Sequence, residues 1–172
     1  MNSTSLASSN KRGNLKRSLS RLASVQALYQ ITLLSEDPDN IIDNYLKNYL
    51  KVISSYENEN ESNFDEIVYF DKIDHKFFNK LTKGTWSEID KIDSLIEEFL
   101  HEEWPINRLE ILIKSILRLG IGEIILFEKT PPKVIITEYM EITSAYYDEK
   151  EVKMINAILD KIIHLHRKKE IK

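Results

Sequence analysis

Turn-forming residues are scarce in this chain, and their scarcity constrains the fold more than any other feature. Only four glycines and four prolines are spread over 172 residues. Sandwiches and barrels of short strands need a turn signal about every ten residues, so the sequence predicts an all-α protein of long elements. The length fits one domain, or two small subdomains that share a core. The absence of cysteine excludes disulfides and thiol catalysis, and it fits a reducing compartment.

Apolar periodicity predicts about seven helices. A stripe of large side chains at helical spacing predicts the first, over residues 15–34: Leu15, Leu19, Leu22, Tyr29 and Leu33. The other expected helices cover residues 41–56, 65–83, 85–100, 107–129, 131–146 and 149–166. Asp39 or Asn40 can cap the second helix, and Gly84 is a suitable residue for ending the third. Thr85 or Ser87 can then cap the fourth.

The expected helix over residues 107–129 is apolar almost all round, which is typical of a buried helix. Charged residues interrupt it before it reaches the roughly eighteen apolar residues of a membrane span, so the sequence predicts no membrane segment. Gly120 and Gly122 each cost about 1 kcal/mol relative to alanine inside a helix, which predicts another backbone close by. Glu110, Lys114 and Arg118 form one polar stripe. Ordinary i,i+4 pairing between side chains explains why the stripe exists. A partner protein that binds there would explain why an otherwise buried helix keeps one solvent-exposed edge, which we call its wet edge.

Charge is distributed unevenly along the chain. Residues 1–35 carry five basic side chains and no acid. Residues 36–103 hold eighteen acidic against seven basic side chains, and the tail over residues 167–172 is basic again. A basic arm of this kind is either simply solvated or recruits a polyanion. Residues 1–14 are rich in serine and basic, with little to bury, so they are expected to form a disordered tail. The same composition also fits an organelle transit peptide.

No catalytic constellation is present in the sequence. The four histidines are scattered, and no phosphate-binding glycine loop or nucleophile-elbow motif occurs. We therefore expect a binding protein and not an enzyme, with no cofactor, no metal site and no small-molecule substrate.

The first helix carries the best candidate for binding. Lys16, Arg17 and Arg21 lie there, and Gln26 and Tyr29 follow on the same helix. Arginine binds phosphates in a bidentate manner. Arg17 and Arg21 are one turn apart and are expected on the face opposite the apolar stripe. Tyr29 is either a stacking platform for single-stranded RNA or, as we favour, a core residue.

A second candidate lies on the last helix. Asn156 sits one position from the apolar stripe of that helix. It is either a binding residue or an amide that a neighbouring turn satisfies.

Four motifs occur in an order and spacing that resembles the NusB family of transcription antitermination factors. They are "LASVQALYQ" (22–30), "ILRLGIGEI" (116–124), "PPKVIITEYMEI" (131–142) and "KMINAILDKI" (153–162). The likeness runs from about residue 17 to residue 162. It implies two packed helical subdomains, expected here over residues 15–84 and 85–166.

The resemblance also implies a function. Family members pair with the ribosomal protein NusE, bind the boxA element of nascent ribosomal RNA as a single strand, and join the antitermination complex on RNA polymerase, which implies a cytoplasmic protein. Residues that match family motifs or lie beside them become candidates. For RNA they are Lys16, Arg17, Arg21, Gln26, Tyr29, Lys153 and Asn156, and for the protein partner they are Lys114 and Arg118.

The arginine-rich motif is thinner here than in the family, because Ser18 and Leu19 replace basic residues. A helical protein–protein adaptor without appreciable RNA affinity therefore stays open as the alternative.

Overall fold

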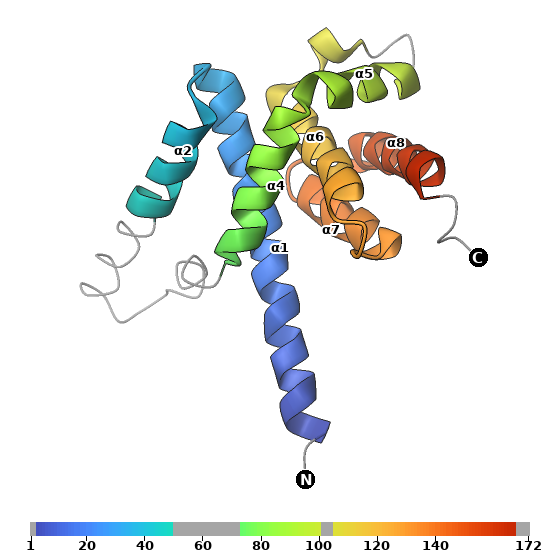
Figure 1. Cartoon of the computed structure of the whole chain (residues 1–172). Helices are drawn as coiled ribbons and strands as arrows, with labels where there is room; N and C mark the ends of the chain where they lie inside the picture. Colours follow the sequence, from blue (N-terminus) through green and yellow to red (C-terminus); the bar gives the residue numbers. More distant parts are fainter. Residues whose placement is uncertain (1–2, 50–72, 101–104, 168–172) are drawn as a thin grey trace. The chain divides into compact units, whose positions relative to one another are not determined.

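A computed structural model of the chain describes residues 3–49, 73–100 and 105–167 (Figure 1). Within these ranges it contains seven α-helices, two short helical segments of other types and no strand, which confirms the all-helical expectation. The chain divides into two compact units, Met1–Lys80 and Leu81–Lys172, and each is described here by itself. The division falls inside one helix, α4 (His75–Ser87), which also contains the boundary expected at residue 84.

The first unit begins with the long helix α1 (Ser3–Leu34). It starts well before residue 15, which differs from the tail that composition predicts for residues 1–14. The segment contains no proline and runs directly into a formed helix, and extending a helix costs far less than nucleating one.

The stripe of large apolar residues forms only part of the buried face of α1. Leu19 packs against the core and Leu22 and Tyr29 are half-buried. Leu15 and Leu33 are 45% and 52% exposed, so their assignment to a buried stripe is wrong. The side chains that are buried instead are mostly small: Ser20, Ala23, Ser24, Val25, Ala27, Leu28 and Ile31. A face of small residues lets neighbouring helices approach closely, and a search for large apolar side chains at helical spacing overlooks it.

Helix α2 (Pro38–Asn44) follows, and it continues into η1 (Tyr45–Tyr49), a turn of π-helix. Its cap is Asp37, whose carboxylate accepts hydrogen bonds from the main-chain N–H of Asp39 (2.8 Å) and of Asn40 (3.4 Å). The expectation that Asp39 or Asn40 is itself the cap is wrong, because Pro38 occupies the first helical position, for which its fixed φ is suited. Residues 50–56 of the expected helix lie outside the described residues.

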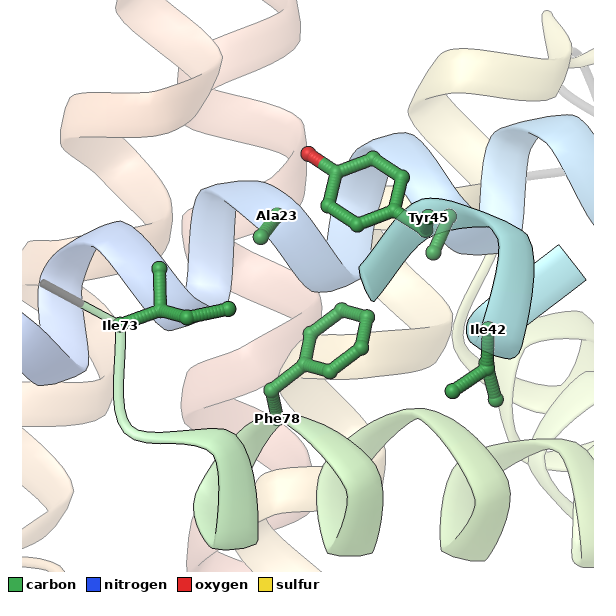
Figure 2. Packing of buried hydrophobic residues seen from close by; sticks show 6 residues of the cluster. Ala23, Ile42, Tyr45, Ile73 and Phe78 are labelled. Carbon is green, nitrogen blue, oxygen red and sulfur yellow. The ribbon is translucent and has the colours of Figure 1, made fainter. Parts of the chain in front are cut away.

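The core of the first unit joins α1, α2, η1 and the start of α4 (Figure 2). Ala23 of α1 and Ile42 of α2 lie beside the rings of Tyr45 and Phe78. The two rings stack with centroids 5.6 Å apart, an arrangement that stabilises by about 0.5–1.5 kcal/mol beyond the area it buries. Ile73 closes the cluster immediately before α4.

Helix α4 does not stop at Gly84, as had been expected, but continues to Ser87. Gly84 serves close packing within the second unit, since a Cβ there would lie 2.6 Å from Cδ1 of Leu126. The next helix, α5 (Ile89–Phe99), begins after Glu88. Thr85 and Ser87 therefore belong to α4, and the prediction that either of them caps the following helix is wrong. Residues 65–72 of the expected third helix lie outside the described residues.

The second unit is built around α6 (Ile111–Leu126), which packs against α5, α7 (Pro132–Ser144) and α8 (Glu149–His166). Ten of its residues, from Ile113 to Ile124, are buried, which confirms a buried central helix. The helix is shorter than expected, because a 3-10 turn, η3 (Ile106–Arg108), precedes it and the chain leaves the helix at Phe127. No helix in the described part of the chain is long and apolar enough to cross a membrane.

The two glycines of α6 make room for side chains and not for a neighbouring backbone. A Cβ on Gly120 would lie 2.9 Å from Cδ2 of Leu159 and 3.5 Å from the ring of Tyr139. A Cβ on Gly122 would collide with the side chain of Thr85. Close approach at these positions was expected, but its source is the interdigitation of α6 with side chains of α4, α7 and α8.

Candidate nucleic-acid interface

The exposed cations of the first unit lie in the middle of α1. Lys16 and Arg17 are both exposed, and they line a surface cleft of about 740 Å3. The start of α4 forms the other side of this cleft, with residues 73–76. The guanidinium carbon of Arg17 lies 5.5 Å from the ring centroid of Phe77, which orients the side chain without removing it from solvent.

Arg21 is not on an exposed face. Its side chain is only 2% exposed, and its guanidinium carbon lies 5.2 Å from the centroid of the Phe77 ring. Because Arg17 and Arg21 are four residues apart, they share one face of α1, and that face meets α4. Arg17 lies at the edge of this contact, whereas Arg21 lies inside it. The expectation that Arg21 lies on an exposed face is therefore wrong.

Gln26 and Tyr29, the other two candidates on α1, are half-buried. The side-chain oxygen of Gln26 accepts a hydrogen bond of 2.6 Å from the hydroxyl of Tyr45. Gln26 thus ties α1 to η1 within the first unit. Half-burial of Tyr29 leaves only part of its ring accessible.

The candidates on α8, Lys153 and Asn156, are exposed and belong to the second unit. The ammonium of Lys153 lies 2.6 Å from a carboxylate oxygen of Glu149, and the two side chains are 74% and 86% exposed. An exposed i,i+4 pair of this kind contributes at most about 0.5 kcal/mol, so a stronger acceptor can readily displace Glu149.

The partner-binding candidates lie on α6, and the structure corrects how one of them is placed. Arg118 forms a bidentate ion pair with Asp93 of α5, with Nε–Oδ1 and Nη2–Oδ2 distances of 2.7 Å. Its side chain is only 11% exposed, so it is wrong to place it on a wet edge. Lys114, one turn earlier, is half-buried. Glu110 accepts a hydrogen bond of 2.8 Å from the hydroxyl of Tyr147, so the stripe also joins α6 to the residues that follow α7.

Arg167 begins the stretch that composition predicts to be a basic tail, but it is buried at 6% exposure. Its guanidinium donates hydrogen bonds to the main-chain carbonyls of Ile124, Phe127 and Thr130. These carbonyls lie at and just beyond the end of α6, where a helix leaves acceptors without partners. A basic residue at the end of a helix was the available signal, but the sequence does not show that the end of another helix lies within its reach.

Among the described residues, no group of histidine and acidic side chains could hold a metal ion.

Comparison with known proteins identifies the family to which the chain is similar. A family model described as the NusB family matches residues 18–164. Transcription antitermination protein NusB of Rickettsia bellii is 37% identical over 154 residues, which cover 89% of this chain and 93% of that protein. The corresponding protein of Rhodospirillum rubrum is 34% identical and covers 86% of this chain and 83% of its own length.

Solved structures share the fold. A structure of T. maritima NusB is 30% identical, has a TM-score of 0.63 and covers 87% of this chain and 92% of its own. A structure of antitermination factors NusB and NusE in complex with dsRNA is 23% identical, with a TM-score of 0.64 over 90% of this chain and 98% of that one. From the match over residues 18–164 and from these relatives, the chain belongs to the NusB family of transcription antitermination proteins.

Proposed function

We propose that this protein is an RNA-binding transcription antitermination factor. With NusE it binds boxA-like elements of nascent ribosomal RNA and joins the antitermination complex on RNA polymerase, in the cytoplasm. Family membership supports this role, and the family is non-enzymatic. The observation that carries the proposal is the pair of exposed cations Lys16 and Arg17, which line a surface cleft. Both belong to the stretch of residues 1–35, which contains no acidic residue.

In this proposal the α1 residues contribute in different ways. Lys16 and Arg17 contact phosphates, because both are exposed and basic. Arg21 contributes indirectly: its guanidinium packs against the ring of Phe77, which also contacts the guanidinium of Arg17. Gln26 and Tyr29 lie further along α1 than the cations, and their accessible parts contact the RNA there.

Lys153 and Asn156 provide a second exposed polar surface for the RNA on α8. For the protein partner, we propose that NusE contacts α6 at Lys114. Arg118 acts there through its ion pair with Asp93, which holds α5 against α6 and so shapes the surface that NusE meets.

A filter-binding assay with boxA-like single-stranded RNA, performed with and without NusE, tests the proposal. Each phosphate that the protein neutralises contributes about −0.7 to the slope of log K against log salt. The double variant Lys16→Ala with Arg17→Ala should therefore flatten the slope by about 1.4. Lys47→Ala is the matched control, because Lys47 is 72% exposed in the same unit but does not line the cleft.

The alternative adaptor function predicts a different result. The protein would then bind NusE but show no affinity for boxA-like RNA, whether NusE is present or absent. RNA binding with an unaltered salt slope in the double variant would contradict the placement of the site on α1.

A further inference from the structure

The cleft beside Lys16 and Arg17 has a second wall, to which nothing in the sequence directs attention. It is formed by the residues that begin α4, from Ile73 to Lys76. His75 and Lys76 are both exposed there. The cleft therefore carries basic side chains on both sides, contributed by segments that are far apart in the sequence.

A buried hydroxyl fixes the two walls relative to each other. Ser20 of α1 is fully buried, and its Oγ accepts a hydrogen bond of 2.8 Å from the main-chain N–H of Asp74. The same hydroxyl lies 2.7 Å from the carbonyl oxygen of Lys16, to which it donates. The first turn of α4 is thus tied to the turn of α1 that carries Lys16 and Arg17, within one compact unit.

The charge in the cleft comes from side chains. Lys16, Arg17 and Lys76 are positive, and Asp74 is the acid among the lining residues. The carboxylate of Asp74 accepts a hydrogen bond of 3.0 Å from the N–H of Phe77, so it caps α4 and occupies the start of that helix. The attraction of the cleft for an anion therefore depends on its three cationic side chains, and the carboxylate of Asp74 opposes it.

We propose that the first turn of α4 is the second wall of the RNA site, in which Lys76 holds a backbone phosphate of the single strand whose neighbouring phosphate meets Lys16 and Arg17. His75 lies beside Lys76 and can donate a ring N–H to the same strand. Asp74 weakens the interaction while it caps the helix. This inference rests on the proposed function and adds to it the α4 residues that hold the RNA.

The first test is Lys76→Ala, with Lys80→Ala as the matched control. Both lysines are exposed on α4 one turn apart, but only Lys76 lines the cleft. Lys76→Ala should flatten the salt slope by about 0.7. If the variant and the wild-type protein bind equally at 1 M salt, this change corresponds to about a fivefold loss of affinity at 0.1 M salt. Lys80→Ala should leave the slope at the wild-type value.

The second test is a gain of affinity, which misfolding cannot produce. In Asp74→Asn the amide oxygen can still cap α4, because asparagine is as good a cap as aspartate, but the negative charge is gone. We expect RNA affinity to rise about two- to fivefold at low salt, and the gain to vanish at high salt where the charge is screened. Should Lys76→Ala fail to fold, this variant decides the question.

The outcomes separate the inference from the proposed function. If the wild-type protein binds RNA and both Lys76→Ala and Asp74→Asn bind with its affinity and slope, the second wall is refuted and the α1 site stands. If the wild-type protein binds no RNA with or without NusE, both proposals fall.

Discussion

Replacing Arg167 by methionine removes one guanidinium and keeps an unbranched side chain in its place. In the wild-type protein this group donates four hydrogen bonds to three main-chain carbonyls, among them Nη2 to the oxygens of Ile124 (2.8 Å) and Phe127 (2.9 Å). The side chain is 6% exposed, so water does not readily replace it. The variant therefore leaves the carbonyls of Ile124 and Thr130 without the donor that Arg167 supplies, whereas the carbonyl of Phe127 keeps the main-chain N–H of Thr130.

The magnitude follows from those acceptors. A buried carbonyl that loses its donor costs about 1–3 kcal/mol, so the carbonyls of Ile124 and Thr130 together set a range of about 2–6 kcal/mol before any relaxation. Partial hydration and non-additivity reduce this figure, and we expect the free energy of unfolding to fall by about 2–4 kcal/mol. That is a large part of the roughly 5–15 kcal/mol that stabilises a typical domain. Arg167→Lys should recover part of the loss, because an ammonium can donate but lacks the planar fork.

Urea denaturation followed by far-ultraviolet circular dichroism measures the effect, provided that the dependence of the free energy on urea stays unchanged. Lys153→Met on α8, the helix that Arg167 follows, is the control. Its 74% exposed side chain makes a surface ion pair, and its replacement should cost at most about 0.5 kcal/mol. Amide exchange at Thr130, whose N–H donates to Phe127, should also accelerate in Arg167→Met. A variant with the wild-type unfolding free energy would show that the carbonyls find other donors, and it would refute the reasoning.

Three further variants test the packing. Gly120→Leu should lower the free energy of unfolding by about 1–3 kcal/mol through overpacking against Leu159, and an unchanged denaturation midpoint would contradict the close contact. Arg118→Glu should cost about 3–5 kcal/mol because it places a second carboxylate beside Asp93, and the exchanged pair with Asp93→Arg should restore part of the loss. Arg21→Ala should lower the melting temperature, because the side chain is buried. A variant of unchanged stability with a flattened RNA salt slope would instead show that Arg21 contacts phosphates.

Several features of the fold were predictable because they depend on residues close in sequence. The last helix has the bounds that its apolar periodicity predicts, from Glu149 to His166. The apolar character of α6 identifies it as the central helix of its unit, and the structure buries it. Helix ends were less predictable. Asp37, Asp39 and Asn40 are all good caps, and the choice among them depends on where Pro38 lies.

The candidate site was predictable only in part. Arg17 is exposed as expected, and Lys16 is exposed too, but Arg21 is buried although it lies on the same face of α1 as Arg17. Sequence spacing shows that Arg17 and Arg21 share a face, but not that Phe77 covers half of it. For the same reason it gives no sign that Lys76 faces the cations of α1 across a cleft.

By itself the sequence determined that the protein is helical, which helix is central, and to which family the chain belongs. Helical hydrogen bonds and the periodicity of apolar residues act over a few residues, so a linear reading contains them. Only the tertiary structure decided which charges face solvent. Arg118 meets Asp93 from 25 residues away, and Arg167 meets Ile124 from 43 residues away. A charged side chain is buried only where such distant partners satisfy its hydrogen bonds, and those partners are brought together by packing alone.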